Sequence, residues 1–123
     1  VCESWLTPAL FLSVTFFAAS VTSFFTGSSW GTFAICIPIA VPMAYSFTGG
    51  QLGTLVYAAV GAVVSGGLFG DHCSPVSDTS VLSSLGAACD HIDHVRTQLP
   101  YALLAAAVSI ILWIVVALVG GAA

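Results

Sequence analysis

The side chains that could do chemistry gather in one stretch, residues 70–80, which reads Gly-Asp-His-Cys-Ser-Pro-Val-Ser-Asp-Thr-Ser. It combines two carboxylates, an imidazole, a thiol and four hydroxyls with a proline that interrupts helices. Oxygen ligands of these kinds suit a hard cation such as sodium. A carboxylate held away from water also keeps its proton more tightly, and sodium can replace that proton. One side chain can therefore serve both ions in turn, which is the simplest mechanism of exchange.

A second group of hydroxyls lies in residues 26–32, where two glycines bracket serines and a tryptophan between apolar runs. Glycines in this arrangement indicate a turn. Two interrupted apolar elements are the sequence signature of a secondary transporter whose binding site lies near the bilayer midplane. The oxygen-bearing candidates from the two interruptions are Ser28, Ser29, Thr32, Asp71, Ser74, Ser77, Asp78, Thr79 and Ser80.

Among these candidates the sequence favours Asp78 as the main carboxylate, because it lies between Ser77 and Thr79, just after the break that the proline induces and just before the short helix begins. We expect sodium to bind at these three residues. Asp71 either shares this task or serves chiefly as a partner of the helix break, and His72 either relays protons or caps a helix. An unpaired acid in hydrocarbon is unfavourable enough to suggest a function, whereas a hydroxyl in a membrane helix usually bonds to its own backbone.

Composition places the chain in a lipid bilayer. Of its 123 residues, 59% are hydrophobic and 5% are charged, whereas about a quarter of the residues in soluble domains are charged. Arg96 is the only lysine or arginine, so the chain cannot neutralise phosphates, which excludes nucleic-acid binding. The sequence predicts an all-α, multi-pass protein of the cell membrane, a transporter rather than an enzyme, with no cofactor besides transported sodium and protons.

The apolar pattern also predicts the elements that position the candidate residues. Residues 6–47 contain two apolar runs separated by the turn at residues 26–32. The second run, residues 33–47, contains two prolines and has roughly 15 residues, against the ~20 that a full crossing needs. We therefore expect a re-entrant helical hairpin rather than two membrane spans.

Residues 52–88 predict one discontinuous helix, with helical parts at residues 52–69 and 79–88 and a non-helical break between them. Small residues four positions apart allow helices to approach closely in a bilayer. The pairs with this spacing are Gly49 with Gly53, Ala58 with Ala62, and Gly66 with Gly70.

Residues 89–98 form the most hydrophilic run and predict a polar surface loop. Its acids and histidines (Asp90, His91, Asp93 and His94) are expected to be solvated, with a pH-sensing role as the alternative. The positive-inside tendency places this loop in the cytoplasm because it contains Arg96. Residues 99–119 predict a final transmembrane helix that begins near Pro100.

A different class of function is a membrane metal site or metalloenzyme built from cysteines and histidines. The residues for it are His72, Cys73, Cys89, His91 and His94. Their types fit zinc, but the sequence has no His-Glu-x-x-His helix and no closely spaced cysteine pair. We therefore expect no structural zinc. A packing subunit without a substrate is a third interpretation, and it does not explain two acids within the membrane.

Three motifs, residues 28–33, 70–79 and 89–101, closely resemble those of NhaC-type sodium/proton antiporters. The resemblance implies membership of the ion transporter superfamily, whose carriers consist of two inverted repeats. Each repeat has a re-entrant hairpin and a broken helix, and the carriers commonly form homodimers. By this resemblance, residues 1–123 look like the C-terminal repeat, and the N-terminal repeat is the missing partner.

The resemblance also implies that the hairpin tip and the helix break meet, which places residues 28–32 against residues 74–79. It widens the range of substrates as well. Relatives of this kind exchange organic acids or amino acids together with sodium and protons, so a coupled organic-substrate antiporter is the alternative function.

Overall fold

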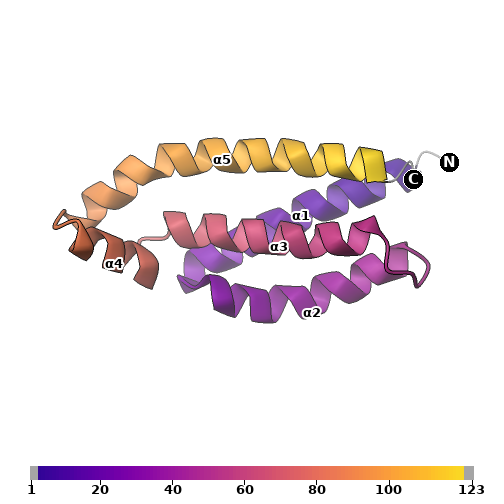
Figure 1. The fold of residues 1–123 in the computed structure, drawn as a ribbon, viewed down its shortest axis with the longest axis horizontal. Coiled ribbons are helices and arrows are strands. Elements are labelled where there is room, and N and C mark those ends of the chain that lie inside the picture. Colours follow the sequence, from indigo (N-terminus) through magenta and orange to yellow (C-terminus); the bar gives the residue numbers. More distant parts are fainter. Residues whose placement is uncertain (1–2, 121–123) are drawn as a thin grey trace.

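The computed structural model describes residues 3–120, and within them the chain folds into five helices and no strand (Figure 1). The helices are α1 (Glu3–Thr26), α2 (Ser29–Phe47), α3 (Thr54–Cys73), α4 (Asp78–Gly86) and α5 (His91–Gly120). All except α4 are long and apolar enough to cross a membrane. The predicted all-α membrane fold is thereby confirmed for the described residues, and both ends of the predicted unit 1–123 lie outside them.

The helices α1 and α2 run antiparallel and form a helical hairpin (Figure 1). The chain reverses at Gly27, whose φ of 65° is readily adopted only by glycine. Ser28 then begins the second helix as its N-cap, because its Oγ accepts a hydrogen bond from the Gly31 amide at 3.4 Å. The tip of the hairpin is therefore a tight turn at residues 27 and 28.

The second arm of the hairpin is longer than the sequence predicts. α2 has 19 residues because it begins directly after Ser28 and continues through Pro38 and Pro42. Each proline removes only one amide donor from the helix, and membrane helices tolerate this. The predicted shortness of this arm is thus wrong, and its length gives no support to a re-entrant path.

The break in the discontinuous helix is shorter than predicted and begins later. α3 continues to Cys73, so Asp71 and His72 are helical, and only residues 74–77 separate α3 from α4. The reason is local, since Pro75 disfavours helical geometry at the residue before it, and Ser74 has extended angles of φ −74° and ψ 127°. Each candidate aspartate consequently lies in a helix on its own side of the break.

Most of the predicted polar loop is helical, because α5 begins at His91 rather than near Pro100. Asp90 starts it by accepting hydrogen bonds from the amides of Ile92 at 2.9 Å and Asp93 at 3.3 Å. Pro100 lies inside the helix, and the orange part of α5 is bent (Figure 1). The connection from α4 is therefore limited to residues 87–90.

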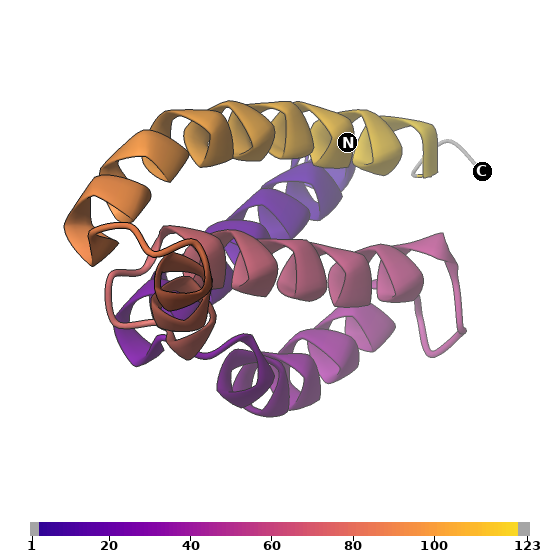
Figure 2. The same ribbon diagram turned by 60° about the vertical axis from the view of Figure 1, so that its left-hand side comes forward.

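Packing is centred on α3, which contacts α1, α2 and α5 (Figure 2). A Cβ at Gly66 would collide with the carbonyl oxygen of Phe16, and one at Gly70 with that of Ser20. The predicted close approach at Gly66 and Gly70 is confirmed.

The other two pairs of small residues differ from each other. Ala58 and Ala62 are buried in the core, as a packing role requires. Gly49 instead lies in the turn between α2 and α3, and no atom lies within 4 Å of the place where its Cβ would be. The predicted packing role of Gly49 is therefore wrong, and its φ of 67° shows that the turn needs a glycine there.

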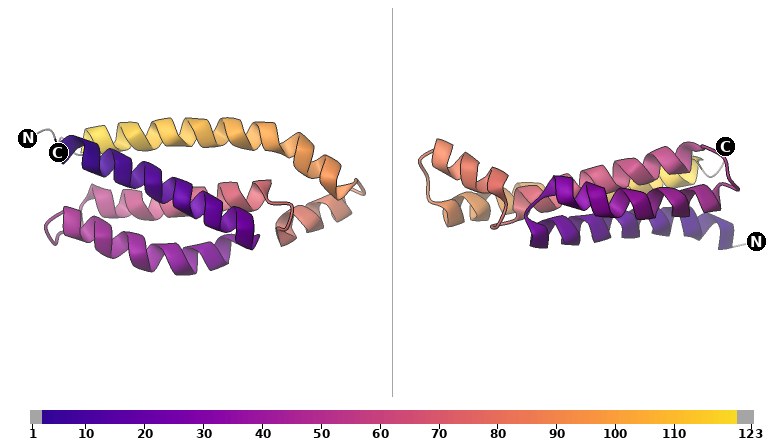
Figure 3. Two further views of the ribbon diagram at one scale, coloured as in Figure 1. Left: turned by 180° about the vertical axis from the view of Figure 1, so that it is seen from behind. Right: turned by 90° about the horizontal axis from the view of Figure 1, so that it is seen from below.

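At one end of the molecule, α4 and the start of α5 extend beyond the other helices (Figure 1). The hairpin tip ends beside the break, while α4 and the first turns of α5 continue past it (Figures 1 and 3). The connection between α2 and α3 lies at the opposite end from the connection between α4 and α5. Large apolar side chains such as Leu104 and Ile111 stand exposed along α5, as expected of a surface that faces lipid or further protein.

Candidate functional site

Asp71 is the most enclosed of the four aspartates, since the other three are exposed. It lies in the last turn of α3 and is 3% exposed. Ser77 Oγ donates a hydrogen bond to its Oδ1 at 2.6 Å, and Thr79 Oγ1 donates to its Oδ2 at 3.3 Å. The two hydroxyl oxygens are 2.7 Å apart. The turn of the break thus brings the hydroxyls of Ser77 and Thr79 against Asp71, which precedes the break in the chain.

The break is held against the hairpin by a buried serine. Ser74 is fully buried, and its Oγ donates a hydrogen bond to the carbonyl oxygen of Phe24 at 2.7 Å. The same Oγ accepts a hydrogen bond from the Val76 amide at 3.2 Å, which fixes the turn of the break. A Cβ at Gly27 would lie 2.9 Å from the carbonyl carbon of Val76. The hairpin tip and the helix break therefore meet, and the contact lies at Gly27.

The two aspartates occupy opposite electrostatic surroundings. Asp71 lies at the C-terminal end of α3, where the helix dipole is negative and favours a cation. Asp78 begins α4, where the dipole is positive and favours an anion. Asp78 is exposed, and its Oδ1 accepts a hydrogen bond from the Thr79 amide at 3.0 Å. Asp71 is thus buried at the negative end of one helix, whereas Asp78 is exposed at the positive end of the next.

Within residues 3–120, the side chains that bond to Asp71 are hydroxyls, and none is basic. Arg96 is the only lysine or arginine of the chain, and it is exposed on α5. Hydrogen bonds from two hydroxyls stabilise a carboxylate without cancelling its charge. Asp71 is therefore a buried carboxylate whose side-chain partners, among the described residues, are neutral hydroxyls.

The candidates at the hairpin tip bond mainly to their own helix. Ser28 caps α2, and Thr32, which is fully buried, donates its Oγ1 hydrogen to the Ser28 carbonyl oxygen at 3.0 Å. Ser29 is 8% exposed at the first position of the helix. Within residues 3–120, the side chains that bond to Asp71 are those of Ser77 and Thr79, and none comes from the tip. The tip reaches the break through its backbone instead.

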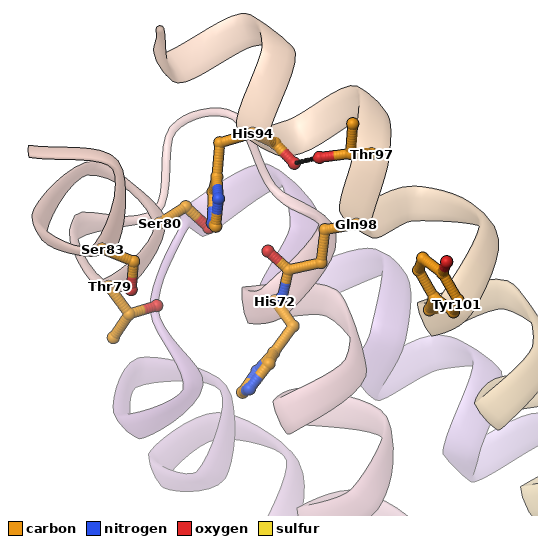
Figure 4. Close-up of a pocket in the computed structure, with 8 residues that line it drawn as sticks. All are labelled: His72, Thr79, Ser80, Ser83, His94, Thr97, Gln98 and Tyr101. Carbon is orange, nitrogen blue, oxygen red and sulfur yellow. Dashed lines mark hydrogen bonds between the residues drawn. The ribbon is translucent and has the colours of Figure 1, made fainter. Parts of the chain in front are cut away.

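A cavity of about 360 Å³, lined by residues that carry polar groups, lies between α3, α4 and α5 (Figure 4). Its lining residues are His72, Thr79, Ser80, Ser83, His94, Thr97, Gln98 and Tyr101. The sequence singled out His72, Thr79 and Ser80 as candidates for the ion site and His94 for a metal site or pH sensing, but not Ser83, Thr97, Gln98 or Tyr101. The spacing of His94, Gln98 and Tyr101 matches one face of a helix, and this signal is missed when residues 89–98 are treated as a loop.

His72 lies on the wall of this cavity rather than inside the Asp71 site. Its ring is exposed, and its Nδ1 lies 2.9 Å from the carbonyl oxygen of Leu68. A carbonyl can only accept, so Nδ1 carries the hydrogen and Nε2 remains available to the cavity. The geometry is compatible with the predicted proton relay and also with the predicted helix-capping role.

His91 connects three elements, although the sequence predicts a solvated side chain there. Its Nε2 lies 2.7 Å from the carbonyl oxygen of Pro75 in the break, and its Nδ1 lies 3.3 Å from Ser84 Oγ on α4. Since the carbonyl only accepts, Nε2 carries a hydrogen. The first residue of α5 thus ties the break to the short helix that follows it.

The residues of the alternative metal site do not converge. Among the described residues, no group of three His, Cys, Asp or Glu side chains is close enough to hold a metal ion. His91 is engaged with Pro75, while Cys73 is buried in α3 and Cys89 is exposed. The arrangement offers hydroxyl and carboxylate oxygens instead, which suit a hard cation.

Comparison with known proteins decides the family. The model of the Na+/H+ antiporter family matches residues 1–118 of the chain. The chain belongs to this family. Its members are transporters rather than enzymes. The family match, together with a relative named NhaC, confirms the resemblance of the three sequence motifs to NhaC-type antiporters.

Three relatives illustrate the range of this antiporter family. An uncharacterized protein of Haemophilus influenzae is 50% identical over 89% of this chain and 20% of its own length. A malate-2H(+)/Na(+)-lactate antiporter of Bacillus subtilis is 36% identical over 93% and 23%. The Na(+)/H(+) antiporter NhaC of Alkalihalophilus pseudofirmus is 32% identical over 92% and 23%. The chain therefore spans about a fifth of the length of these relatives. No solved structure matches it.

Proposed function

We propose that this chain is part of a secondary active transporter that exchanges sodium for protons across the cell membrane. Asp71 is the carboxylate that binds the two ions in turn. The observation that carries this proposal is its setting: a carboxylate 3% exposed, at the negative end of α3, with both oxygens facing hydroxyls of the helix break. Family membership supports the same class of transport.

Sodium binds between Asp71, Ser77 and Thr79 in this proposal. A hydroxyl that donates its hydrogen to a carboxylate still has lone pairs, and these can turn toward a cation that sits between them. The two hydroxyl oxygens are only 2.7 Å apart, so little movement brings them to one ion. Carbonyls at the end of a half-helix are further ligands for sodium in transporters of this general design. Asp78, which the sequence ranked first, is assigned to attracting cations at the exposed start of α4.

Exchange follows from the single charge of the site. A proton or a sodium ion each neutralises the carboxylate, so binding of one displaces the other. The ionised and unoccupied site is a buried charge, which is unfavourable and resists movement through the membrane. Only the two neutralised forms then pass between the two sides, and this couples the ions to each other.

The proposal also covers the position of the site in the membrane and the assembly of the whole transporter. We place the site at the midplane of the bilayer, where the hairpin tip meets the break, and we place the α4 to α5 connection in the cytoplasm. The reach of α4 and early α5 beyond the hairpin tip supports a hairpin that turns back inside the membrane (Figure 1). The other inverted repeat supplies the opposite wall of the site, and the complete transporter forms a homodimer.

Coupled exchange of an organic acid is the second candidate function. It is favoured by the relative named as a malate-2H(+)/Na(+)-lactate antiporter, which is 36% identical to this chain. In this case the same carboxylate carries sodium or protons, and the organic anion binds beside it. Amino acid exchange is the corresponding variant implied by the NhaC-type resemblance.

Proton flux into vesicles tests both candidates. The full-length transporter is reconstituted, a sodium gradient is imposed, and the internal pH is followed with a dye. The measurement is repeated with lithium, with potassium, and with malate or lactate inside. Sodium-driven flux without an organic anion supports the main proposal. Flux that requires malate or lactate supports the second candidate, and no sodium-driven flux under either condition contradicts both.

A further inference from the structure

The cavity between α3, α4 and α5 is separate from the Asp71 site, but the two share one residue. Thr79 lines the cavity, and its Oγ1 donates a hydrogen bond to Asp71 Oδ2 at 3.3 Å. Asp71 itself is buried and does not line the cavity. A single threonine hydroxyl therefore lies between the buried carboxylate and a polar space that is open to its surroundings.

The size of the cavity fits a hydrated cation. Its volume is about 360 Å³, which corresponds to roughly ten water molecules at ~30 Å³ each. Hydroxyl, amide, imidazole and phenol groups line it from three helices (Figure 4). None of the lining residues is an Asp, Glu, Lys or Arg. Neutral oxygen ligands hold sodium weakly, and weak binding suits a position from which an ion must move on.

Gln98 supplies the second, independent observation. Its side-chain oxygen Oε1 is shielded from solvent and has no hydrogen-bond partner among the described residues. Buried amide oxygens almost always have a partner, because leaving one unpaired is unfavourable by about 1–3 kcal/mol. Gln98 lies on the wall of the cavity, on the same face of α5 as His94 (Figure 4). A small rotation of the Gln98 side chain would turn this unpaired acceptor into the cavity, where a cation or its hydration water can be its partner.

We propose that this cavity is the aqueous access route to Asp71 and that Gln98 Oε1 binds sodium in it transiently. Hydroxyls of Thr79, Ser80 and Ser83 complete the set of weak oxygen ligands. Thr79 then passes the ion to Asp71, because its hydroxyl reaches both places. This inference rests on the proposed function and adds to it a second sodium position and the side from which the ion arrives.

Thiol labelling tests the access route without requiring transport. Ser83→Cys is introduced into the full-length transporter, with the native cysteines replaced, and membranes are treated with a charged thiol reagent. We expect rapid labelling from the α4 to α5 side that slows at least threefold in sodium compared with choline of equal ionic strength. Val108→Cys is the matched control and should stay unlabelled, because Val108 is exposed on the apolar part of α5, which faces lipid or further protein, and does not line the cavity.

Substitution of Gln98 tests the transient sodium position. Gln98→Leu keeps the approximate shape and removes the oxygen, so it should abolish the protection of Ser83→Cys by sodium. In flux measurements it should raise the KM for sodium about five- to tenfold and change kcat much less, as expected for loss of one ligand. Gln98→Glu adds a carboxylate and should lower the KM for sodium.

Several outcomes would overturn the inference. Ser83→Cys as unreactive as Val108→Cys would show that the cavity is not an aqueous route. Labelling that is unaffected by sodium, or a Gln98→Leu variant with unchanged KM, would remove Gln98 as a ligand. If the proposed function itself is wrong, the results differ from these. Sodium-driven proton flux is then absent in the unmodified transporter, whether or not sodium protects Ser83→Cys.

Discussion

Asp71 and Asp78 flank the same helix break, and their individual surroundings separate their roles. Asp71 is buried with hydroxyl donors on both oxygens, while Asp78 is exposed at the positive end of α4. The sequence alone favours Asp78 because of its neighbours along the chain. The structure favours Asp71 because Ser77 and Thr79, the same two neighbours, bond to it across the break.

Substituting each aspartate by its amide tests this assignment. In the full-length transporter, Asp71→Asn should reduce sodium-driven proton flux to background, because an amide neither releases a proton nor neutralises sodium. The fold should remain, since the amide is nearly isosteric and a neutral buried group is less unfavourable than a charged one. Asp78→Asn should retain flux and lose about 0.3–1 kcal/mol of favourable helix-dipole interaction.

The measurement is vesicle flux at several pH values after equal expression has been confirmed. Flux at the unmodified level in Asp71→Asn, together with loss of flux in Asp78→Asn, would reverse the assignment and restore the ranking that the sequence favours.

Among the elements, the approach of α3 to α1 determines where the break can lie. Gly66 and Gly70 bring the α3 backbone against α1, and Ser23 Oγ donates a hydrogen bond to the carbonyl oxygen of Gly67 at 2.6 Å. The end of α3 is thereby fixed beside the hairpin tip. The small-residue spacing of this face was predictable from sequence, whereas the partner helix was not, because spacing does not identify what packs against it.

Adding one methyl group tests this close approach. Gly70→Ala places a Cβ against the backbone of α1, which cannot move aside, so we expect a loss of several kcal/mol or misfolding, at or above the ~1–3 kcal/mol typical of overpacking. Gly86→Ala is the matched control, because nothing lies within 4 Å of its Cβ position. Thermal unfolding in detergent should show a lower Tm for Gly70→Ala alone. Equal Tm values for both variants would contradict the close packing of α3 on α1.

His91 is the second element-scale connection, since it joins α5 to the break. His91→Leu removes the donor to the Pro75 carbonyl oxygen and should destabilise the transporter by about 0.5–1.5 kcal/mol, the net range for one hydrogen bond at an exposed position. Asp93→Asn, at an exposed position of the same first turn, should change Tm much less. A His91→Leu variant as stable as the unmodified protein would show that the bond to Pro75 contributes little.

At the scale of the whole molecule, the α2–α3 connection and the α4–α5 connection lie at opposite ends (Figure 1). Residues 48–53 join α2 to α3 at one end, and residues 87–90 join α4 to α5 at the other. If the bundle crosses the bilayer along its length, these connections face opposite sides of the membrane. The positive-inside tendency predicts the orientation of the bundle, with Arg96 on the cytoplasmic side.

Cys89 reports this direction because its side chain is exposed in the α4 to α5 connection. With the other cysteines replaced, an impermeant thiol reagent should fail to label Cys89 in intact cells and should label it after the cells are opened. Gln51→Cys, in the opposite connection, should show the reverse pattern. Labelling of Cys89 in intact cells would place the α4 to α5 connection outside.

The sequence by itself determined the membrane setting, the helical class, the family and the existence of a helix break. These properties follow from local composition: apolar runs form membrane helices, and Pro75 keeps Ser74 out of helical geometry and so ends α3. Only the tertiary structure decided that Asp71 is the enclosed carboxylate, that His91 holds the break, and that Gln98 lines a cavity. Each of these depends on how the chain turns at residues 74–77 and 87–90 and on which helix faces meet, and short-range composition does not specify contacts between separate helices.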